Sequence, residues 1–306
     1  MMRRTPNRDA LRVYSRENDY VGPSSAILGD PDHPAFAGSI ARRKDAATAS
    51  ERAGFSHRPG PRLLEAAEIA DLPAAAGRDG LTVAILVDQS GGLRGATSDR
   101  IVSCVDRIAL SLEAAGTPFE VLGFSTLRWK GGLARERWVS EGRPESPGRL
   151  GDLMHVIHKE VGEGWADGSP SPRERLDLML RDPYMREGMD GEAVAWALDR
   201  LQTSNAPERV LVVVGDATPV DDATIQVESG AFLEADLVRS VRRAAREGVR
   251  IEAVAVAADA AVAEFFPRTS YIPAAGEDMD PVEAARSTLE ALGMSPAPKP
   301  GAGPRV

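Results

Sequence analysis

The chain has 306 residues, of which 42% are hydrophobic and 27% charged, and this balance is ordinary for a folded globular protein. It excludes a mainly disordered chain and a collagen-like fibre. The single cysteine, Cys104, excludes a disulfide scaffold and predicts a reducing compartment. Residues 1–80 hold 12 of the 37 basic and 11 of the 46 acidic residues, so residues 81–306 hold 25 against 35 and carry a net −10. The negative electrostatic field of such a charge disfavours binding of nucleic acid and favours binding of cations or basic partner surfaces.

No apolar run approaches the roughly 20 residues that a membrane-spanning helix needs. The longest candidate, Leu81–Val87, stops at Asp88. The basic N-terminus is not followed by the apolar segment of a secretory signal. We therefore expect a cytoplasmic protein that does not contact membranes.

The first 78 residues are predicted to form a poorly structured N-terminal arm. Prolines and glycines interrupt this stretch and aliphatic residues rarely cluster, and only Pro61–Leu72 has the spacing of a short helix. Because such a composition buries little apolar surface to offset its ordering entropy, residues 1–60 are predicted to be dispensable for folding. The folded domain is expected over residues 79–294, followed by a disordered Pro/Gly/Ala tail over 295–306.

Apolar runs alternate with helical periodicity through the predicted domain. The continuous run Leu81–Val87 predicts a strand buried on both faces, and Arg100–Ala115 has helical spacing that buries Cys104. The further elements are expected to be strands at Pro118–Phe124, Arg209–Val214, Val249–Ala257 and Ser270–Ile272, and helices at Gly230–Gly248 and Pro281–Leu292. This alternation predicts an α/β fold: a doubly wound, Rossmann-like, mostly parallel sheet flanked by helices. The functional crevice of such sheets lies at the carboxyl ends of the strands.

Acidic residues follow two of these strands directly. Asp88 ends the first run and Asp216 follows Arg209–Val214. A buried carboxylate at a strand tip is costly without a cation, and Mg²⁺ takes its ligands from carboxylate, hydroxyl and water oxygens. With Ser90 two residues after Asp88, the pattern predicts an oxygen-ligand metal site. Capping of the following loops or helices explains the same carboxylates equally well.

Five longer blocks of sequence carry a more specific resemblance. They are VDQSGGLRG (87–95), EVLGFSTLRWKGG (120–132), SEGRPESPGRLGDLMHVIHK (140–159), MDGEAVAWALDRL (189–201) and VGDATPVDDAT (214–224). In this order they resemble the von Willebrand factor A-type (VWA) domain of the CobT subunit of aerobic cobaltochelatase. The blocks span some 80–224, and the resemblance implies that the predicted domain at 79–294 is a VWA domain. The long N-terminal region and acidic segment of that subunit have no counterpart here, so a trimmed relative serving another complex stays open beside a cobaltochelatase subunit.

The resemblance also implies a metal-ion-dependent adhesion site that holds Mg²⁺ or Mn²⁺. Asp88 and Ser90 match its first two positions, Asp190 stands at the position of the loop ligand, and Asp216 matches the final carboxylate. Gly92 stands where the family has a second serine, so water would fill that ligand position.

The function implied by the resemblance is a non-catalytic binding and scaffolding subunit. It would dock to an AAA+ ATPase, CobS-like or MoxR-like, in a chelatase or remodelling complex, which inserts cobalt in cobalamin biosynthesis if the protein is an orthologue. A large chelatase subunit and self-association are further partners that the resemblance allows. Loops carrying Arg94, Lys130 and Thr218 are expected to flank the metal site and contribute to docking. A VWA module without metal and a metal-dependent hydrolase remain as alternatives.

Other candidate residues favour structural roles. His155 and His158 are expected at i, i+3 on a helix, a spacing that suits a transition metal, but no cysteine or third histidine lies nearby and a solvated polar face is favoured. Ser90 lacks the Gly-x-Ser-x-Gly context of a hydrolase nucleophile. Trp129 is expected as an exposed contact and Trp196 as a core residue.

Overall fold

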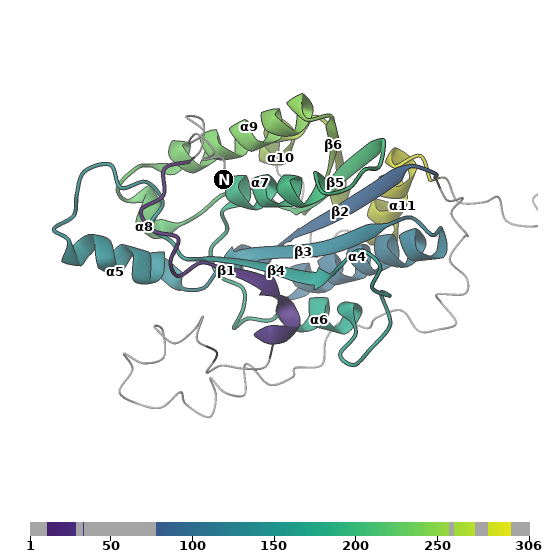
Figure 1. Ribbon diagram of the computed structural model, residues 1–306, viewed down its shortest axis with the longest axis horizontal. Coiled ribbons are helices and arrows are strands. Elements are labelled where there is room, and N and C mark those ends of the chain that lie inside the picture. Colours follow the sequence, from purple (N-terminus) through teal and green to yellow (C-terminus); the bar gives the residue numbers. More distant parts are fainter. Residues whose placement is uncertain (1–10, 29–32, 34–77, 257–259, 273–280, 295–306) are drawn as a thin grey trace, which may run out of the picture.

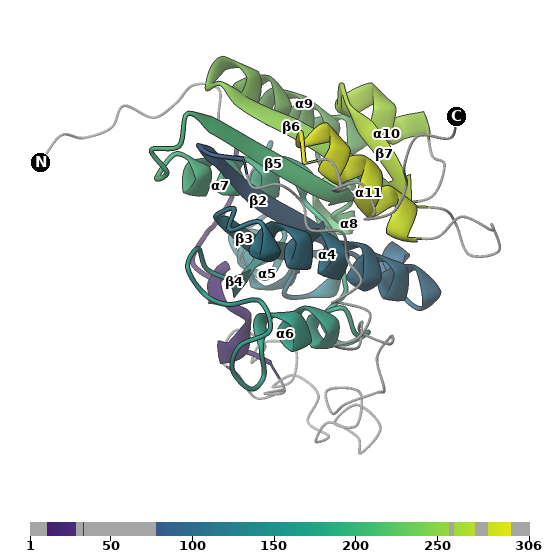
Figure 2. The same ribbon diagram turned by 90° about the vertical axis from the view of Figure 1, so that its right-hand side faces the viewer.

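Runs of aliphatic residues form a seven-stranded sheet with helices on both faces (Figure 1, Figure 2). The computed structural model describes residues 11–28, 33, 78–256, 260–272 and 281–294. The strand order is β1-β4-β3-β2-β5-β6-β7. The strands are β1 (Tyr20–Pro23), β2 (Leu81–Asp88), β3 (Phe119–Thr126), β4 (Leu153–Lys159), β5 (Glu208–Gly215), β6 (Val249–Val256) and β7 (Thr269–Ile272). Only the β3–β4 pair is antiparallel among the described strands, which confirms the predicted doubly wound, mostly parallel sheet.

Helices cover the two faces of the sheet and build a core on each. Alternate residues of β2 point to opposite sides, so Val83 and Ile85 pack with α4 and α11 while Ala84 and Leu86 pack with α7 and α9. Cys104 on α4 is fully buried, as predicted. The helices are α4 (Ala96–Ala114), α5 (Gly132–Ser140), α6 (Pro172–Met179), α7 (Asp190–Leu201), α8 (Asp222–Ile225), α9 (Gly230–Arg246), α10 (Ala260–Phe265) and α11 (Pro281–Ala291). Short 3₁₀ turns occur at Ser24–Ala26, Gly91–Leu93 and Trp129–Gly131.

Helix ends follow local sequence signals, including one that periodicity alone did not reveal. Gly248 lies just beyond α9 with φ of 68°, a left-handed conformation that glycine adopts without strain, as its predicted capping role requires. Helix α6 was not predicted, although it begins at a capping box in which the Ser171 hydroxyl accepts from the Glu174 N–H and the Glu174 carboxylate accepts from the Ser171 N–H.

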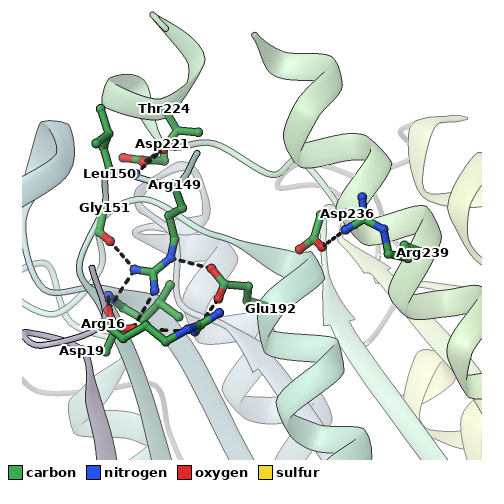
Figure 3. Close-up of polar contacts among 11 residues, drawn as sticks. Arg16, Asp19, Arg149, Leu150, Gly151, Glu192, Asp221, Thr224, Asp236 and Arg239 are labelled. Atoms are coloured by element: carbon green, nitrogen blue, oxygen red, sulfur yellow. Dashed lines mark hydrogen bonds and ion pairs between the residues drawn. The ribbon is translucent and has the colours of Figure 1, made fainter. Parts of the chain in front are cut away.

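The segment 11–28 differs from the poorly structured arm that the sequence predicts. Its strand β1 pairs in parallel with β4 and forms one edge of the sheet. The fully buried Arg149, in the loop before β4, joins this segment to the domain, because it donates to both carboxylate oxygens of Asp19 at 2.9 and 2.6 Å (Figure 3). A buried guanidinium needs such partners, and the sequence pattern alone does not reveal them. The helix expected at Pro61–Leu72 and the tail 295–306 lie outside the described residues.

The expected helix with His155 and His158 is wrong, because both residues lie on strand β4. Both rings are buried, and burial lowers the pKa of each to about 3, so each is neutral. His155 stacks on Trp196 with ring centroids 4.7 Å apart, and Trp196 is partly buried against the core formed with α7 and α9. The run LMHVIHK has no regular alternation of apolar and polar residues, and its two histidines find buried neighbours only in the folded sheet. These histidines are therefore packing residues rather than a solvated face.

In the described part of the chain, no helix combines the length and the hydrophobicity that crossing a membrane requires.

Candidate metal centre

The fold brings the three predicted carboxylates to one edge of the sheet. Asp88 is the last residue of β2 and Asp216 directly follows β5. These strands are parallel neighbours, with Val87 opposite Val214, so their carboxyl ends lie side by side. Asp190 is the first residue of α7, a helix that packs against β2 and β5. The three carboxylates therefore lie at the carboxyl ends of the strands, the edge where the sequence predicts a functional site.

Glycines let the surrounding backbone approach Asp88 closely. A Cβ at Gly215 would lie 2.7 Å from the Asp88 Cβ, closer than real Cβ atoms come, so a side chain there would displace the carboxylate. The loop before α7 closes the other side, since a Cβ at Gly188 would lie 3.5 Å from Asp88 Oδ1 and 3.4 Å from the Ser90 Cβ. As a result, Asp88 is only 1% exposed and Asp190 only 2%.

Burial and mutual repulsion disfavour ionisation of these carboxyl groups. Burial, followed by the charges of Asp190 and Asp216, raises the pKa of Asp88 well above its ordinary value. Burial and then the charge of Asp216 raise the pKa of Asp190 to about 7. The buried atoms Asp88 Oδ2 and Asp190 Oδ2 have no hydrogen-bond partner among the residues that the structure describes. A bound cation would neutralise the repulsion and supply the missing partners.

Ser90 and Gly92 occupy the turn that faces these carboxylates. The Ser90 N–H donates to Asp88 Oδ1 at 2.7 Å, which holds the turn against the end of β2. Gly92 is exposed, and a Cβ at this position would lie 3.8 Å from Asp216 Oδ2. A serine side chain at position 92 would therefore lie beside Asp216, whereas the glycine leaves this place open.

The donor set fits a hard divalent cation that keeps part of its water shell. Among the described residues, no three His, Cys, Asp or Glu side chains are grouped closely enough to hold a metal ion by themselves. Mg²⁺ suits this arrangement, since it commonly binds through one or two carboxylates and retains several waters. The residues that would hold it are Asp88, Ser90, Asp190 and Asp216, with water in the remaining positions. Neutral oxygen ligands and carboxylates without thiolate or imidazole favour Mg²⁺ or Mn²⁺ over zinc.

Residues 75–283 match the family model described as the VWA domain of the cobalamin biosynthesis protein CobT. This match covers most of the chain and includes every residue of the candidate site. The chain belongs to the CobT VWA family. The family match and the observed sheet order together confirm the predicted VWA fold.

Solved structures similar to this CobT-type VWA domain include other VWA domains at low identity. The SpRpn10 VWA domain is 12% identical with a TM-score of 0.45, covering 67% of this chain and 94% of that one. The von Willebrand factor domain of the type V pili tip protein Mfa5 from Porphyromonas gingivalis is 9% identical with a TM-score of 0.40, covering 74% of this chain and 99% of that one.

The three predicted docking residues of the CobT-type domain lie in loops beside the site, but they differ in how free their side chains are. Lys130 and Thr218 are exposed, and the Thr218 N–H donates to Asp216 Oδ1 at 3.0 Å. Arg94 instead donates to the carbonyl oxygens of Asp182 and Met185, and so holds the loop that leads to α7.

Trp129 adds an apolar surface at this rim of the site. The tryptophan is 48% exposed, as expected, and the Arg94 guanidinium lies 5.3 Å from its ring centroid. A Cβ at Gly91 would lie 2.6 Å from the ring, so the tryptophan covers the turn that carries Ser90. This edge of the sheet thus combines carboxylates, a backbone turn and an exposed aromatic ring.

A second carboxyl pair beside the site was missed by sequence reasoning. Glu187 and Asp221 are buried and hydrogen-bonded to each other, and burial followed by the charge of Asp221 raises the pKa of Glu187 to about 8. The Glu187 carboxylate also accepts from the N–H groups of Lys130 and Asp222, at 3.1 and 3.2 Å. This pair joins three loops at the same edge of the sheet. Nothing in the local sequence distinguishes Glu187 from a surface acid.

Proposed function

We propose that this CobT-type VWA domain is a non-catalytic subunit that docks to an AAA+ ATPase through a bound Mg²⁺ or Mn²⁺. The observation that carries the proposal is the pair of buried, unpartnered oxygens, Asp88 Oδ2 and Asp190 Oδ2, at the edge where β2, β5 and α7 meet. The ion would bind to Asp88, Ser90, Asp190 and Asp216. The ATPase would be CobS-like or MoxR-like, within a cytoplasmic chelatase or related complex of cobalamin biosynthesis.

Exposure on one side of the site supports docking by a partner carboxylate. Gly92 and Thr218 are exposed and Asp216 is half-buried, so this side of the site opens to solvent while Asp88 and Asp190 close the other. A carboxylate from the partner would fill a water position of the ion and form a directional, charge-assisted contact. Lys130, Thr218 and Trp129 would surround the incoming group. Without the ion, the negative domain would repel an acidic partner group.

The chemistry of the neighbouring residues favours binding over hydrolysis. A hydrolase needs a general base within hydrogen-bond reach of its nucleophile or activated water. The histidines of β4 are instead buried and neutral, His155 against Trp196 and His158 beside Gln89. Ser90 belongs to the turn that is fixed to Asp88. We therefore assign the site to partner recognition.

A pull-down against a purified CobS-like or MoxR-like AAA+ ATPase tests the proposal. Wild-type protein should retain the ATPase in Mg²⁺ and lose it in EDTA, and Asp88→Asn should fail in both conditions. The control Asp167→Asn removes the same charge from an exposed loop and should bind like wild type. Circular dichroism establishes that each variant is folded. Retention that is equal with and without chelator would overturn metal-dependent docking while leaving the fold and family intact.

A further inference from the structure

Helix α9 carries a row of arginines away from the metal-site edge. Arg239, Arg242 and Arg246 are spaced i, i+3 and i+7, so they lie along one face of the helix. Helix α9 ends at Arg246 and leads directly into the amino end of β6, whereas the metal site lies at the carboxyl ends of β2 and β5. The row therefore extends toward the opposite edge of the sheet.

Two of these arginines have no partner within the described part of the chain. Arg239 pairs with Asp236 at 2.8 Å (Figure 3), and the neighbouring Arg243 pairs with Asp199 and Glu247. Arg242 and Arg246 are exposed and form neither an ion pair nor a hydrogen bond among the described residues.

The spacing of these two arginines is itself unfavourable. They stand at i, i+4, so their like charges repel each other along the helix. The helix dipole favours basic residues in the last turn, which explains Arg246 but not Arg242, one turn earlier. An arginine pair without partners, on a domain whose net charge is strongly negative, would be stabilised by an external anion.

A cavity of about 400 Å³ lies next to the arginine row. Its lining includes Trp196, His155, Ala195, Leu11 and Val21, which come from α7, β4 and the N-terminal segment. Trp196 and His155 are stacked, and Val21 is 56% exposed, so an apolar side chain could pack here.

The cavity and the arginine row form one surface. Arg239 and Arg246 line the cavity and also line a shallow hollow along α9 with Arg242, Ala235 and Val238. Acidic side chains in the cavity lining are already engaged, since Glu192 pairs with Arg16 and Arg149 while Asp199 pairs with Arg243. We call the surface formed by this cavity and the hollow with Arg239, Arg242 and Arg246 the α9 groove. The charge that is left without a partner on the α9 groove is positive.

We propose that the α9 groove binds an acidic segment of a partner protein, with its carboxylates on Arg242 and Arg246 and one apolar side chain in the cavity on Trp196. The groove and the metal site are separate surfaces, so this interaction goes beyond the proposed metal-dependent docking and does not require the ion. Its affinity depends on charge and falls with salt.

Fluorescence anisotropy with a short fluorescein-labelled peptide of glutamates around one central leucine tests this proposal on the full chain. The double variant Arg242→Glu/Arg246→Glu should weaken binding on the order of tenfold or more, whereas the corresponding lysine variant should retain most of it. Arg107→Glu, on α4 at the other face of the sheet, reverses one charge away from the groove and should bind like wild type. EDTA should have no effect, which separates this result from failure of the metal site.

A cavity-filling variant tests the apolar half of the groove. Ala195→Phe should remove the advantage of the leucine peptide over an all-glutamate peptide and leave the charge dependence unchanged. Equal binding of a glutamine counterpart, or wild-type affinity in the charge-reversed variant, would overturn the proposal. Equal or tighter binding of single-stranded DNA at the same arginines would also overturn it, since it would identify a phosphate site. Circular dichroism confirms that the variants fold.

Discussion

Replacing Arg149 by methionine should strongly destabilise the protein, because this side chain is the buried connection between the N-terminal segment and the domain. Arg149 is fully buried, donates to both oxygens of Asp19, and has its Nε 2.6 Å from Glu192 (Figure 3). Asp19 and Glu192 are themselves only 9% and 8% exposed. Methionine keeps the aliphatic volume but leaves two buried carboxylates without this partner.

The expected magnitude follows from the partners that remain. Loss of one partner from a buried ion pair costs about 3–5 kcal/mol. Arg16 lies 2.8 Å from Glu192 and is 59% exposed, so it compensates in part and places the loss near the lower limit. A change of about 3 kcal/mol in the free energy of unfolding corresponds to a melting temperature lower by roughly 6–12 °C for a domain of this size.

Differential scanning calorimetry of the full chain measures this loss. Arg137→Met is the matched control, because it removes an arginine whose partners Glu17 and Glu141 are exposed, and it should change the melting temperature little. Adding Asp19→Asn and Glu192→Gln to Arg149→Met should recover much of the stability, since no buried charge is then left unpaired. A melting temperature of wild-type value in Arg149→Met would refute the argument that this network holds the segment on the domain.

Three further changes give distinct outcomes. Gly92→Ser should tighten Mg²⁺ binding by roughly tenfold, ~1.4 kcal/mol, by adding a neutral oxygen ligand, and unchanged affinity in calorimetry would place the residue outside the ion's shell. The pKa of Glu187 is raised from 4.5 to about 8, so the folded protein holds a stabilising proton that is lost as the pH rises through that value. In thermal melts, wild type should lose stability relative to Glu187→Gln between about pH 5 and 8, and the difference should stay constant above pH 8. Parallel stability curves for the two proteins would contradict this. Gly123→Ala should cost about 1–3 kcal/mol in denaturant unfolding, because its Cβ would lie 2.7 Å from His158 Nε2, whereas Gly230→Ala, with open space around it, should be tolerated.

The central strands could be predicted from the sequence because they are buried on both faces. The run Leu81–Val87 is continuous and apolar, and its strand extends only one residue further, to Asp88. Strand β4 was missed because the histidines and lysine of Leu153–Lys159 interrupt the apolar pattern, and the polar groups find partners only in the folded sheet. Strand β1 was missed because four residues ending in Pro23 carry almost no periodicity.

For the candidate site as well, some residues could be predicted from the sequence and others could not. Asp88 and Asp216 follow from the rule that parallel strands end at one crevice, whereas Asp190 was identified only through the family resemblance, because its place at the start of α7 depends on chain folding. The pair of Glu187 and Asp221 is formed by loops 34 residues apart (221 − 187), and no local pattern marks either residue. Contacts of that kind become visible only when the loops are placed in space.

Calorimetric titration of Mg²⁺ into the chelator-treated 306-residue chain tests directly whether the edge formed by β2, β5 and α7 binds a metal ion. We expect a saturable, one-site heat in the ~micromolar to millimolar range that disappears in Asp88→Asn and persists in Asp167→Asn. The absence of saturable heat with both Mg²⁺ and Mn²⁺, in protein that circular dichroism shows to be folded, would contradict the assignment of this edge as a metal site.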